Sequence, residues 1–150
     1  SVVGRTEYIA DSATLGGMTK SSSEKIKTLL KGLFEAGYRG TVVMVTTYAM
    51  RYTTLSGEPL VFGAFNRALT GAVSNASKVT PGMKIVVADA YARFAEQAAA
   101  TGNDACKAGL LIKTLNGAPI LDDDRAPTCD RHPSPRGHEV IAAEIARVAR

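Results

Sequence analysis

The sequence has no tryptophan, few other aromatic residues, and no apolar run that approaches the roughly 18 residues a transmembrane helix needs. We therefore expect no membrane-spanning segment. The 18 lysine and arginine residues are scattered along the chain and are not interleaved with stacking aromatic rings. The net charge is +4 and the pI is near 9.2, but this distribution lacks the basic stripe of a nucleic-acid-binding surface. We predict no nucleic-acid partner.

Cysteine and histidine are also scarce, with two of each. Two histidines without a cluster of acidic ligands do not make a metal site, and the pair Gly16-Gly17 is too weak a pattern for a phosphate-binding loop. We therefore predict neither a metal nor another cofactor. By spacing alone, Cys106 and Cys129 fit a disulfide of a secreted protein or two free thiols of a cytosolic one. The chain starts without Met or a signal peptide, for which a mature or trimmed product is the simplest explanation.

What the sequence does contain is an alternation of helical and strand patterns over 150 residues, a length that suits one domain. Residues 1–18 give no clear signal, and their glycine pair predicts a break in any regular element. Ser21 and Glu24 form an S-x-x-E capping box, which predicts a helix that begins at Ser21 and closes at Gly37. The β-branched stretch Thr41–Tyr48 has the nearly continuous apolar character of a strand that is covered on both faces.

The rest of the chain continues this alternation. In order, the patterns predict a helix over 59–76, a strand over 85–88, a helix over 90–100, an irregular segment over 101–131 and a helix from Pro135. Strands that alternate with helices imply right-handed crossovers and a parallel sheet with helices on both faces. We therefore predict an α/β fold in one domain, residues 1–150, in which residues 1–18 are a linker or a truncated N-terminal part.

The C-terminal segment CDRHPSPRGHEV (129–140) places an acid, Asp130, two residues before a histidine, His132. A histidine titrates near neutral pH and can therefore act as a general base unaided. A neighbouring carboxylate can hold its ring in one tautomer and one orientation. The pair therefore predicts the base and the orienting acid of a nucleophilic hydrolase. The alternative is a surface histidine in a turn, beside a solvated acid that caps the last helix.

The same segment resembles the last conserved block of the SGNH (GDSL) hydrolases, in which Asp and His precede a proline, a Gly-His pair and a helix. The stretch GYRGTVVMVTTYAMRY (37–52) and the pairing of Cys106 with Cys129 are similar to actinobacterial-type secreted GDSL esterases. The resemblance covers residues 19–150, the second half of such an enzyme. It implies the three-layer α/β/α sandwich of that family, a Cys106–Cys129 disulfide, and an extracellular or cell-envelope location.

The resemblance also implies an activity. Such an enzyme hydrolyses an ester of a lipid, an acyl group or an acetylated sugar through an acyl-enzyme and needs no cofactor. His132 would serve as the base and then as the acid, and Asp130 would orient it. In most of the family the acid lies three positions before the histidine, where this chain has Cys129. The acidic run 122–124 could supply the orienting acid in place of Asp130, although a solvated turn is the favoured interpretation of that run.

The family's nucleophile lies in a Gly-Asp-Ser motif, for which this chain offers Ala10-Asp11-Ser12. No G-x-N-D block, which would complete an oxyanion hole, lies between Ser12 and Thr41. Three interpretations stay open. The chain is a compact esterase that uses Ser12, or it supplies His132 and Asp130 to a complementary polypeptide that carries the serine. Otherwise it is a non-catalytic α/β module that binds a ligand or a partner protein.

Overall fold

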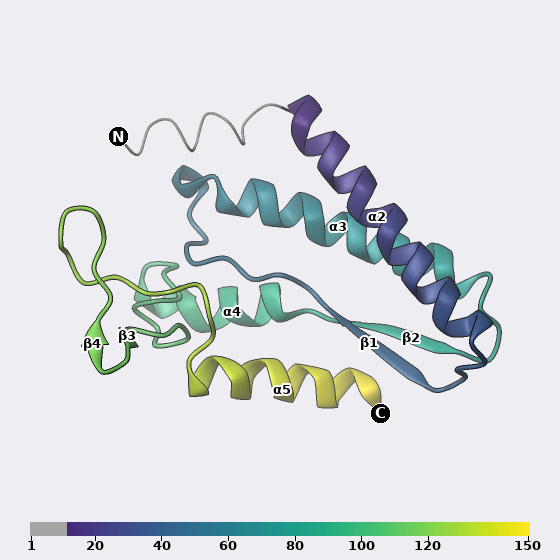
Figure 1. Ribbon diagram of the computed structural model, residues 1–150. Coiled ribbons are helices and arrows are strands. Elements are labelled where there is room, and N and C mark those ends of the chain that lie inside the picture. The colour runs from purple at the N-terminus through teal and green to yellow at the C-terminus, as the bar shows by residue number, and fades with distance from the viewer. Residues whose placement is uncertain (1–11) are drawn as a thin grey trace.

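The computed structural model describes residues 12–150, whose helices and strands appear in Figure 1. The long helices are α2 (Ser12–Glu35), α3 (Glu58–Ser77), α4 (Ala90–Ala98) and α5 (Pro135–Ala149). The strands are β1 (Thr41–Val45), β2 (Lys84–Ala88), β3 (Thr114–Leu115) and β4 (Ala118–Pro119), and two short 3-10 helices are η1 (Thr54–Ser56) and η2 (Ala99–Thr101). The predicted mixed α/β character is confirmed, and the element order matches the prediction from Thr41 to Ala98.

The central sheet contains β1 and β2, which run parallel in a register from Thr41 opposite Lys84 to Val45 opposite Ala88. Helix α3 packs on one side of this sheet and α5 on the other, while α2 packs against α3 (Figure 1). Within residues 12–150, neither outer edge of the sheet is paired with a further strand. The sheet is therefore parallel, as predicted, but small.

Helix α2 begins at Ser12, nine residues before the predicted start at Ser21. The expected break at Gly16-Gly17 is wrong, and so is the capping box, because Ser21 and Glu24 lie inside the helix. A glycine inside a helix costs about 1 kcal/mol relative to alanine, which is too little to end a helix that gains contacts elsewhere. The residues of α2 that pack in the core lie in its second half, from Ile26 to Phe34, and the exposed first turns extend a helix that is already anchored there. Of the predicted linker, residues 1–11 lie outside the described residues.

The segment over 101–131 is irregular, as predicted, but carries a small hairpin that the patterns did not reveal. Strands β3 and β4 pair antiparallel through Asn116 and Gly117, whose φ angles are 52° and 81°. An Asn-Gly pair with both φ angles positive is the usual two-residue hairpin turn. The Cys106–Cys129 disulfide is present and ties the two ends of this segment together. The predicted pairing of the cysteines is confirmed.

The hydrophobic core consists of two clusters. One surrounds the disulfide and centres on Phe94, Leu110 and Leu111, and the other lies between α2, α3 and the sheet around Leu30 and Met83. The strands themselves are less buried than their composition predicts. No residue of β1 is fully buried, and β2 has only Ala88 in that class. The apolar side chains of β1 and β2 are typical of strands in the middle of a wide sheet, and a sheet of only two strands leaves them partly exposed to solvent.

Candidate active site

The loop before α5 is held in place by close backbone contacts with residues 109–112. Ser134 caps α5, accepting a hydrogen bond from Gly137 N at 3.1 Å, and its hydroxyl donates to Gly109 O at 2.6 Å. The amide of Ser134 donates to Leu110 O at 2.9 Å, and Ile112 N donates to His132 O at 3.1 Å. Pro135 opens the helix, as predicted. These contacts fix the backbone on both sides of the candidate base.

Within this loop the two predicted residues meet. Asp130 Oδ1 accepts a hydrogen bond from the backbone N–H of His132 at 2.8 Å and also contacts Nδ1 of the His132 ring. The backbone N–H of His132, followed by the ring contact, lowers the pKa of Asp130 below its ordinary value, so the carboxylate is ionised at neutral pH. A carboxylate at Nδ1 leaves Nε2 as the free, basic nitrogen. The pair therefore has the geometry of an oriented general base.

Contacts with the first half of the described chain place this pair near the carboxyl end of the sheet. Tyr48, which follows β1, donates its hydroxyl to Arg131 O at 2.8 Å. Arg131 forms an ion pair with Glu58 at the start of α3, at 2.9 Å, and lies over the ring of Phe62. Burial, followed by the charge of Asp130, raises the pKa of Tyr48. The sequence patterns did not single out Tyr48 or Arg131 because their contacts join segments that are 83 residues apart.

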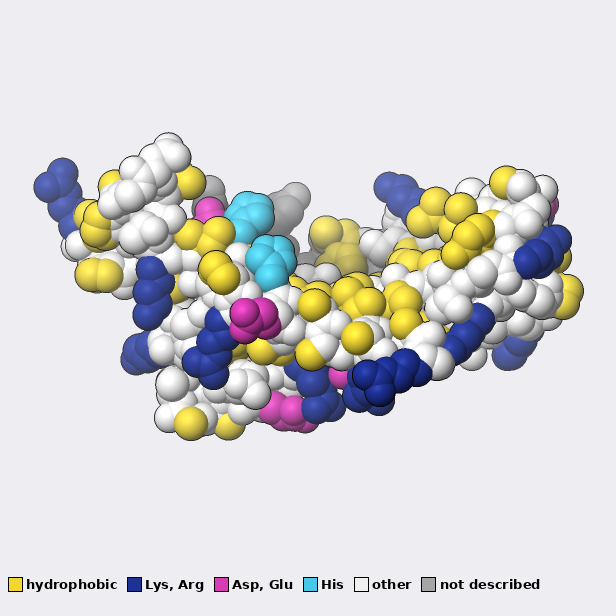
Figure 2. Space-filling model, turned by 90° about the horizontal axis from the view of Figure 1, so that it is seen from below, with side chains coloured by type: hydrophobic (Ala, Val, Ile, Leu, Met, Phe, Trp, Pro, Cys, Tyr) yellow, Lys and Arg dark blue, Asp and Glu magenta, His cyan; other side chains and the backbone are white. Residues whose placement is uncertain are grey.

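The His132 side chain is 79% exposed. The two histidines of the chain, the cyan side chains of Figure 2, both lie at the surface. His138 lies in the first turn of α5, where its amide donates to Ser134 O. In the described part of the chain, no serine or threonine hydroxyl is hydrogen-bonded to the His132 ring. The ring is thus open to a group from outside residues 12–150 or from another molecule.

Ser12, the predicted nucleophile, begins α2 and is exposed. Figure 1 shows the start of α2 well separated from the start of α5, with α3 lying between them. The structure therefore does not bring Ser12 and His132 together. The acidic run 122–124 forms a turn in which Asp122 Oδ1 accepts from the amides of Asp124 and Ala126. That hydrogen bonding matches the interpretation of the run as a turn.

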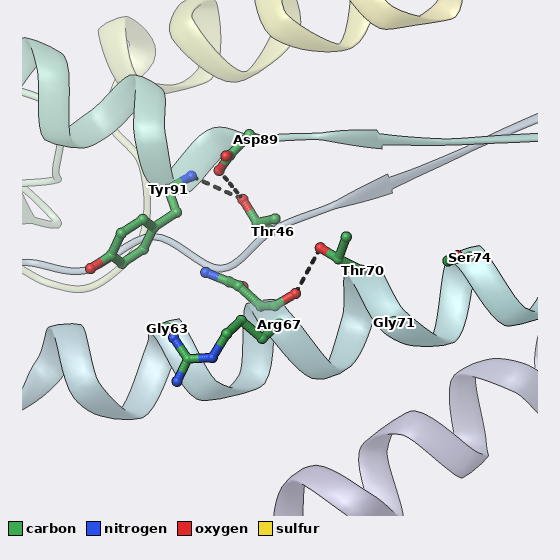
Figure 3. Close-up of a pocket in the computed structure, with 9 residues that line it drawn as sticks. Thr46, Gly63, Arg67, Thr70, Gly71, Ser74, Asp89 and Tyr91 are labelled. Carbon is green, nitrogen blue, oxygen red and sulfur yellow. Dashed lines mark hydrogen bonds between the residues drawn. The ribbon is translucent and has the colours of Figure 1, made fainter.

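A separate cavity of about 430 Å³ lies at the carboxyl ends of β1 and β2, against α3 (Figure 3). Neither Asp130 nor His132 lines it. Its wall includes Asp89, which follows β2 and caps α4 by accepting from Ala92 N at 3.0 Å. Asn66 of α3, which carried no recognisable sequence signal, also lines it. The candidate base and this cavity are therefore two different sites.

Comparisons of the chain with family models, with curated proteins and with solved structures found no significant match. Over residues 12–150, no group of three or more His, Cys, Asp or Glu side chains has an arrangement that could hold a metal ion. None of the helices described here is both long and apolar enough to cross a bilayer.

Proposed function

We propose that this chain supplies the general base and its orienting acid to a serine-type ester hydrolase of the SGNH kind. The observation that carries the proposal is the contact of Asp130 with both the backbone amide and the ring Nδ1 of His132. A solvated acid that served only as a helix cap would not need to meet the ring. Here Ser134 caps α5, so Asp130 is not required for that role.

The chemistry follows from the orientation of the ring. His132 Nε2 removes the proton of a serine hydroxyl as its oxygen attacks the ester carbonyl, and then gives that proton to the departing alkoxide. Nε2 next takes a proton from the water that attacks the acyl-enzyme and returns it to the serine oxygen. Asp130 stays ionised and stabilises the imidazolium that forms in each step. The substrate would be an ester of a lipid, an acyl group or an acetylated sugar.

The proposed source of the serine is a complementary polypeptide, and this is supported by the edge of β1, which has no further strand among residues 12–150. Lys84 N donates to Gly40 O and Thr46 N donates to Ala88 O, so alternate residues of β1 direct their backbone groups at β2. By the same alternation, Val43 and Val45 direct their backbone groups at the other edge, whereas Thr41 O there already accepts a hydrogen bond from the Tyr38 hydroxyl at 2.9 Å. An unpaired, apolar edge pairs readily with another strand. A strand added there would widen the sheet toward the three-layer sandwich of the SGNH family.

The alternative function is a non-catalytic binding module. The exposure of the His132 ring, at 79%, and the absence of a bonded hydroxyl within residues 12–150 favour it. The compact esterase, in which Ser12 attacks, would need the start of α2 to approach the loop before α5.

A fluorophosphonate probe, which reacts with activated serines, tests these alternatives on native material with its co-purifying chains retained. We expect labelling on a second polypeptide, and loss of that labelling in His132→Ala. His138→Ala is the matched control, because His138 is an exposed histidine close by that has no contact with Asp130, and it should keep full labelling. Labelling at Ser12 would favour the compact esterase, and no labelling on any chain would favour the binding module. Labelling retained in His132→Ala would refute the assigned base.

The expected location is extracellular or the cell envelope, where a disulfide such as Cys106–Cys129 persists. The intact mass of native, non-reduced material checks this expectation and the presence of a partner chain together. We expect the mass to fall two hydrogens short of the fully reduced chain. Recovery of free thiols from freshly isolated protein would count against the location.

A further inference from the structure

The hairpin of β3 and β4 lies at one end of the molecule, away from the central sheet (Figure 1). Every residue from 113 to 119 is exposed, and Leu115 keeps 64% of its surface accessible. Each strand is two residues long, and a hydrogen bond from Ile120 N to Lys113 O at 2.9 Å closes the base. A two-stranded hairpin without packed side chains is only marginally stable. The hairpin therefore opens and recloses readily while the rest of the fold stays formed.

The tip of this hairpin is Asn116-Gly117, a dipeptide with a chemistry of its own. A main-chain nitrogen can attack the side-chain amide of the asparagine before it, and glycine permits this close approach because it has no Cβ. A Cβ at Gly117 would meet no atom within 4 Å, so no neighbouring group crowds the tip. The other three of the four asparagines precede residues that have a side chain, in the pairs Asn66-Arg67, Asn75-Ala76 and Asn103-Asp104. Asn116 is therefore the asparagine whose sequence context favours the attack.

The closed turn holds the two reacting groups apart. Asn116 and Gly117 have φ angles of 52° and 81°, the type I′ geometry of a two-residue hairpin turn. In that geometry the Gly117 nitrogen lies on the far side of the Asn116 Cα–C bond from Cβ, and so points away from the side-chain amide. The attack therefore requires the hairpin to open, after which rotation about that bond brings the nitrogen to the amide. The closed hairpin slows the reaction in proportion to the time it spends closed.

We propose that Asn116 is a modification site, at which the side-chain amide is hydrolysed through a succinimide each time the open hairpin allows ring closure. The Gly117 nitrogen forms a bond to Cγ of Asn116, and the amide nitrogen leaves as ammonia with the proton of the Gly117 amide. Water then adds to one of the two ring carbonyl carbons, and the bond from that carbon to the Gly117 nitrogen breaks. Opening at Cγ gives aspartate, and opening at the main-chain carbon gives isoaspartate.

The isoaspartate product would keep the hairpin from reclosing. Its main chain runs through the former side chain and is longer by a methylene, so the two-residue turn no longer fits between Leu115 and Ala118. The Cys106–Cys129 disulfide lies outside the hairpin and still joins the two ends of the irregular segment. We therefore expect displaced amide resonances in the hairpin and unchanged ones in the central sheet. The site goes beyond the proposed ester hydrolysis and does not depend on it.

Incubation of the intact folded chain at neutral pH, followed by peptide mapping with mass spectrometry, tests the proposal. The same chain unfolded in guanidinium chloride gives the rate without the hairpin. We expect conversion at Asn116 before any other asparagine. The folded chain should react more slowly than the unfolded one, but within about a hundredfold, because only a few weak hydrogen bonds hold the turn closed. An isoaspartyl methyltransferase with labelled S-adenosylmethionine should mark the product.

Two results would overturn the proposal. One is an intact Asn116 in the folded chain after an incubation about a hundredfold longer than the unfolded chain needs for conversion. The other is earlier conversion of a different asparagine. Asn116→Gln, whose longer side chain closes the corresponding ring far more slowly, should give no methyl-accepting product at this position. Methyl acceptance that persists undiminished in this variant would exclude Asn116 as the site.

A pair of leucine variants tests the role of the hairpin. Leu115→Gly weakens β3, because glycine is a poor strand former and has no side chain to pair across the hairpin. It should raise the ratio of the folded to the unfolded rate about threefold or more. Leu55→Gly changes an exposed leucine outside the hairpin and should leave the ratio unchanged. An unchanged ratio in Leu115→Gly, with the central sheet still folded by its amide resonances, would refute control by hairpin opening.

Discussion

Replacement of Glu144 by glutamine should expose a pH-dependent part of the stability of the fold. Glu144 lies on α5 and is 3% exposed. Its carboxylate accepts two hydrogen bonds from Arg147, at 2.7 and 2.8 Å, and one from the Asp89 amide at 3.2 Å. The Arg147 hydrogen bonds are the main cause that lowers the pKa of Glu144 from 4.5 to about 2. Helix α5 is thereby joined to the residue that caps α4.

The magnitude follows from the shifted pKa. A fall from 4.5 to about 2 corresponds to about 3 kcal/mol of folding free energy at neutral pH. Because the Arg147 side chain is 65% exposed, solvent screening reduces this to about 2 kcal/mol. Since the folded-state pKa lies below the unfolded one, the contribution is complete above pH 4.5 and is lost as the pH falls toward 2. Glu144→Gln should remove this contribution. The difference in unfolding free energy between variant and wild type should therefore shrink as the pH falls from 4.5 toward 2.

Urea unfolding across this pH range measures the effect, with Glu139→Gln as the matched control on an exposed position of the same helix. We expect Glu139→Gln to follow the wild type at each pH. The electrostatic argument would be refuted if Glu144→Gln were as stable as the wild type at neutral pH. It would also be refuted if the difference between the two persisted unchanged down to pH 2.

Three further substitutions test the contacts around the candidate base. Gly137→Ala would place a Cβ 2.2 Å from Leu110 O, so we expect a loss of about 2 kcal/mol or more in urea unfolding, with displaced amide resonances in the loop before α5. Tyr48→Phe removes the hydrogen bond to Arg131 O and should cost about 1 kcal/mol without changing the fold seen by circular dichroism. Replacing Cys106 and Cys129 together by serine releases a loop with a sequence separation of 23, which should lower stability by about 3 kcal/mol in calorimetry.

The sequence predicted the elements whose signals are local. Three elements lie within one or two residues of their predicted bounds: strand β2, helix α3 and the start of α5 at Pro135. The spacing of apolar residues and the position of the proline define these bounds locally. The Asp130–His132 contact was also predictable, since it joins residues two positions apart. The N-terminal part of α2 was not, because the glycine pair there argues against a helix, and the packed residues that anchor α2 lie further along it, from Ile26 to Phe34. The Asn116-Gly117 turn was missed although its signal is local.

The candidate base combines a local contact with a long-range placement. Asp130 meets His132 through the loop's own backbone, so the pair would form wherever that loop lies. The position of the pair is set by Tyr48, which follows β1, and by Glu58 at the start of α3. Both bind Arg131, which lies between Asp130 and His132, and hold it at the carboxyl end of the sheet. For the proposed hydrolysis, a histidine that is oriented in this way and open to solvent still needs a hydroxyl nucleophile and the donors of an oxyanion hole. The edge of β1, which carries no further strand within residues 12–150, is where we propose that a strand of the complementary polypeptide brings them.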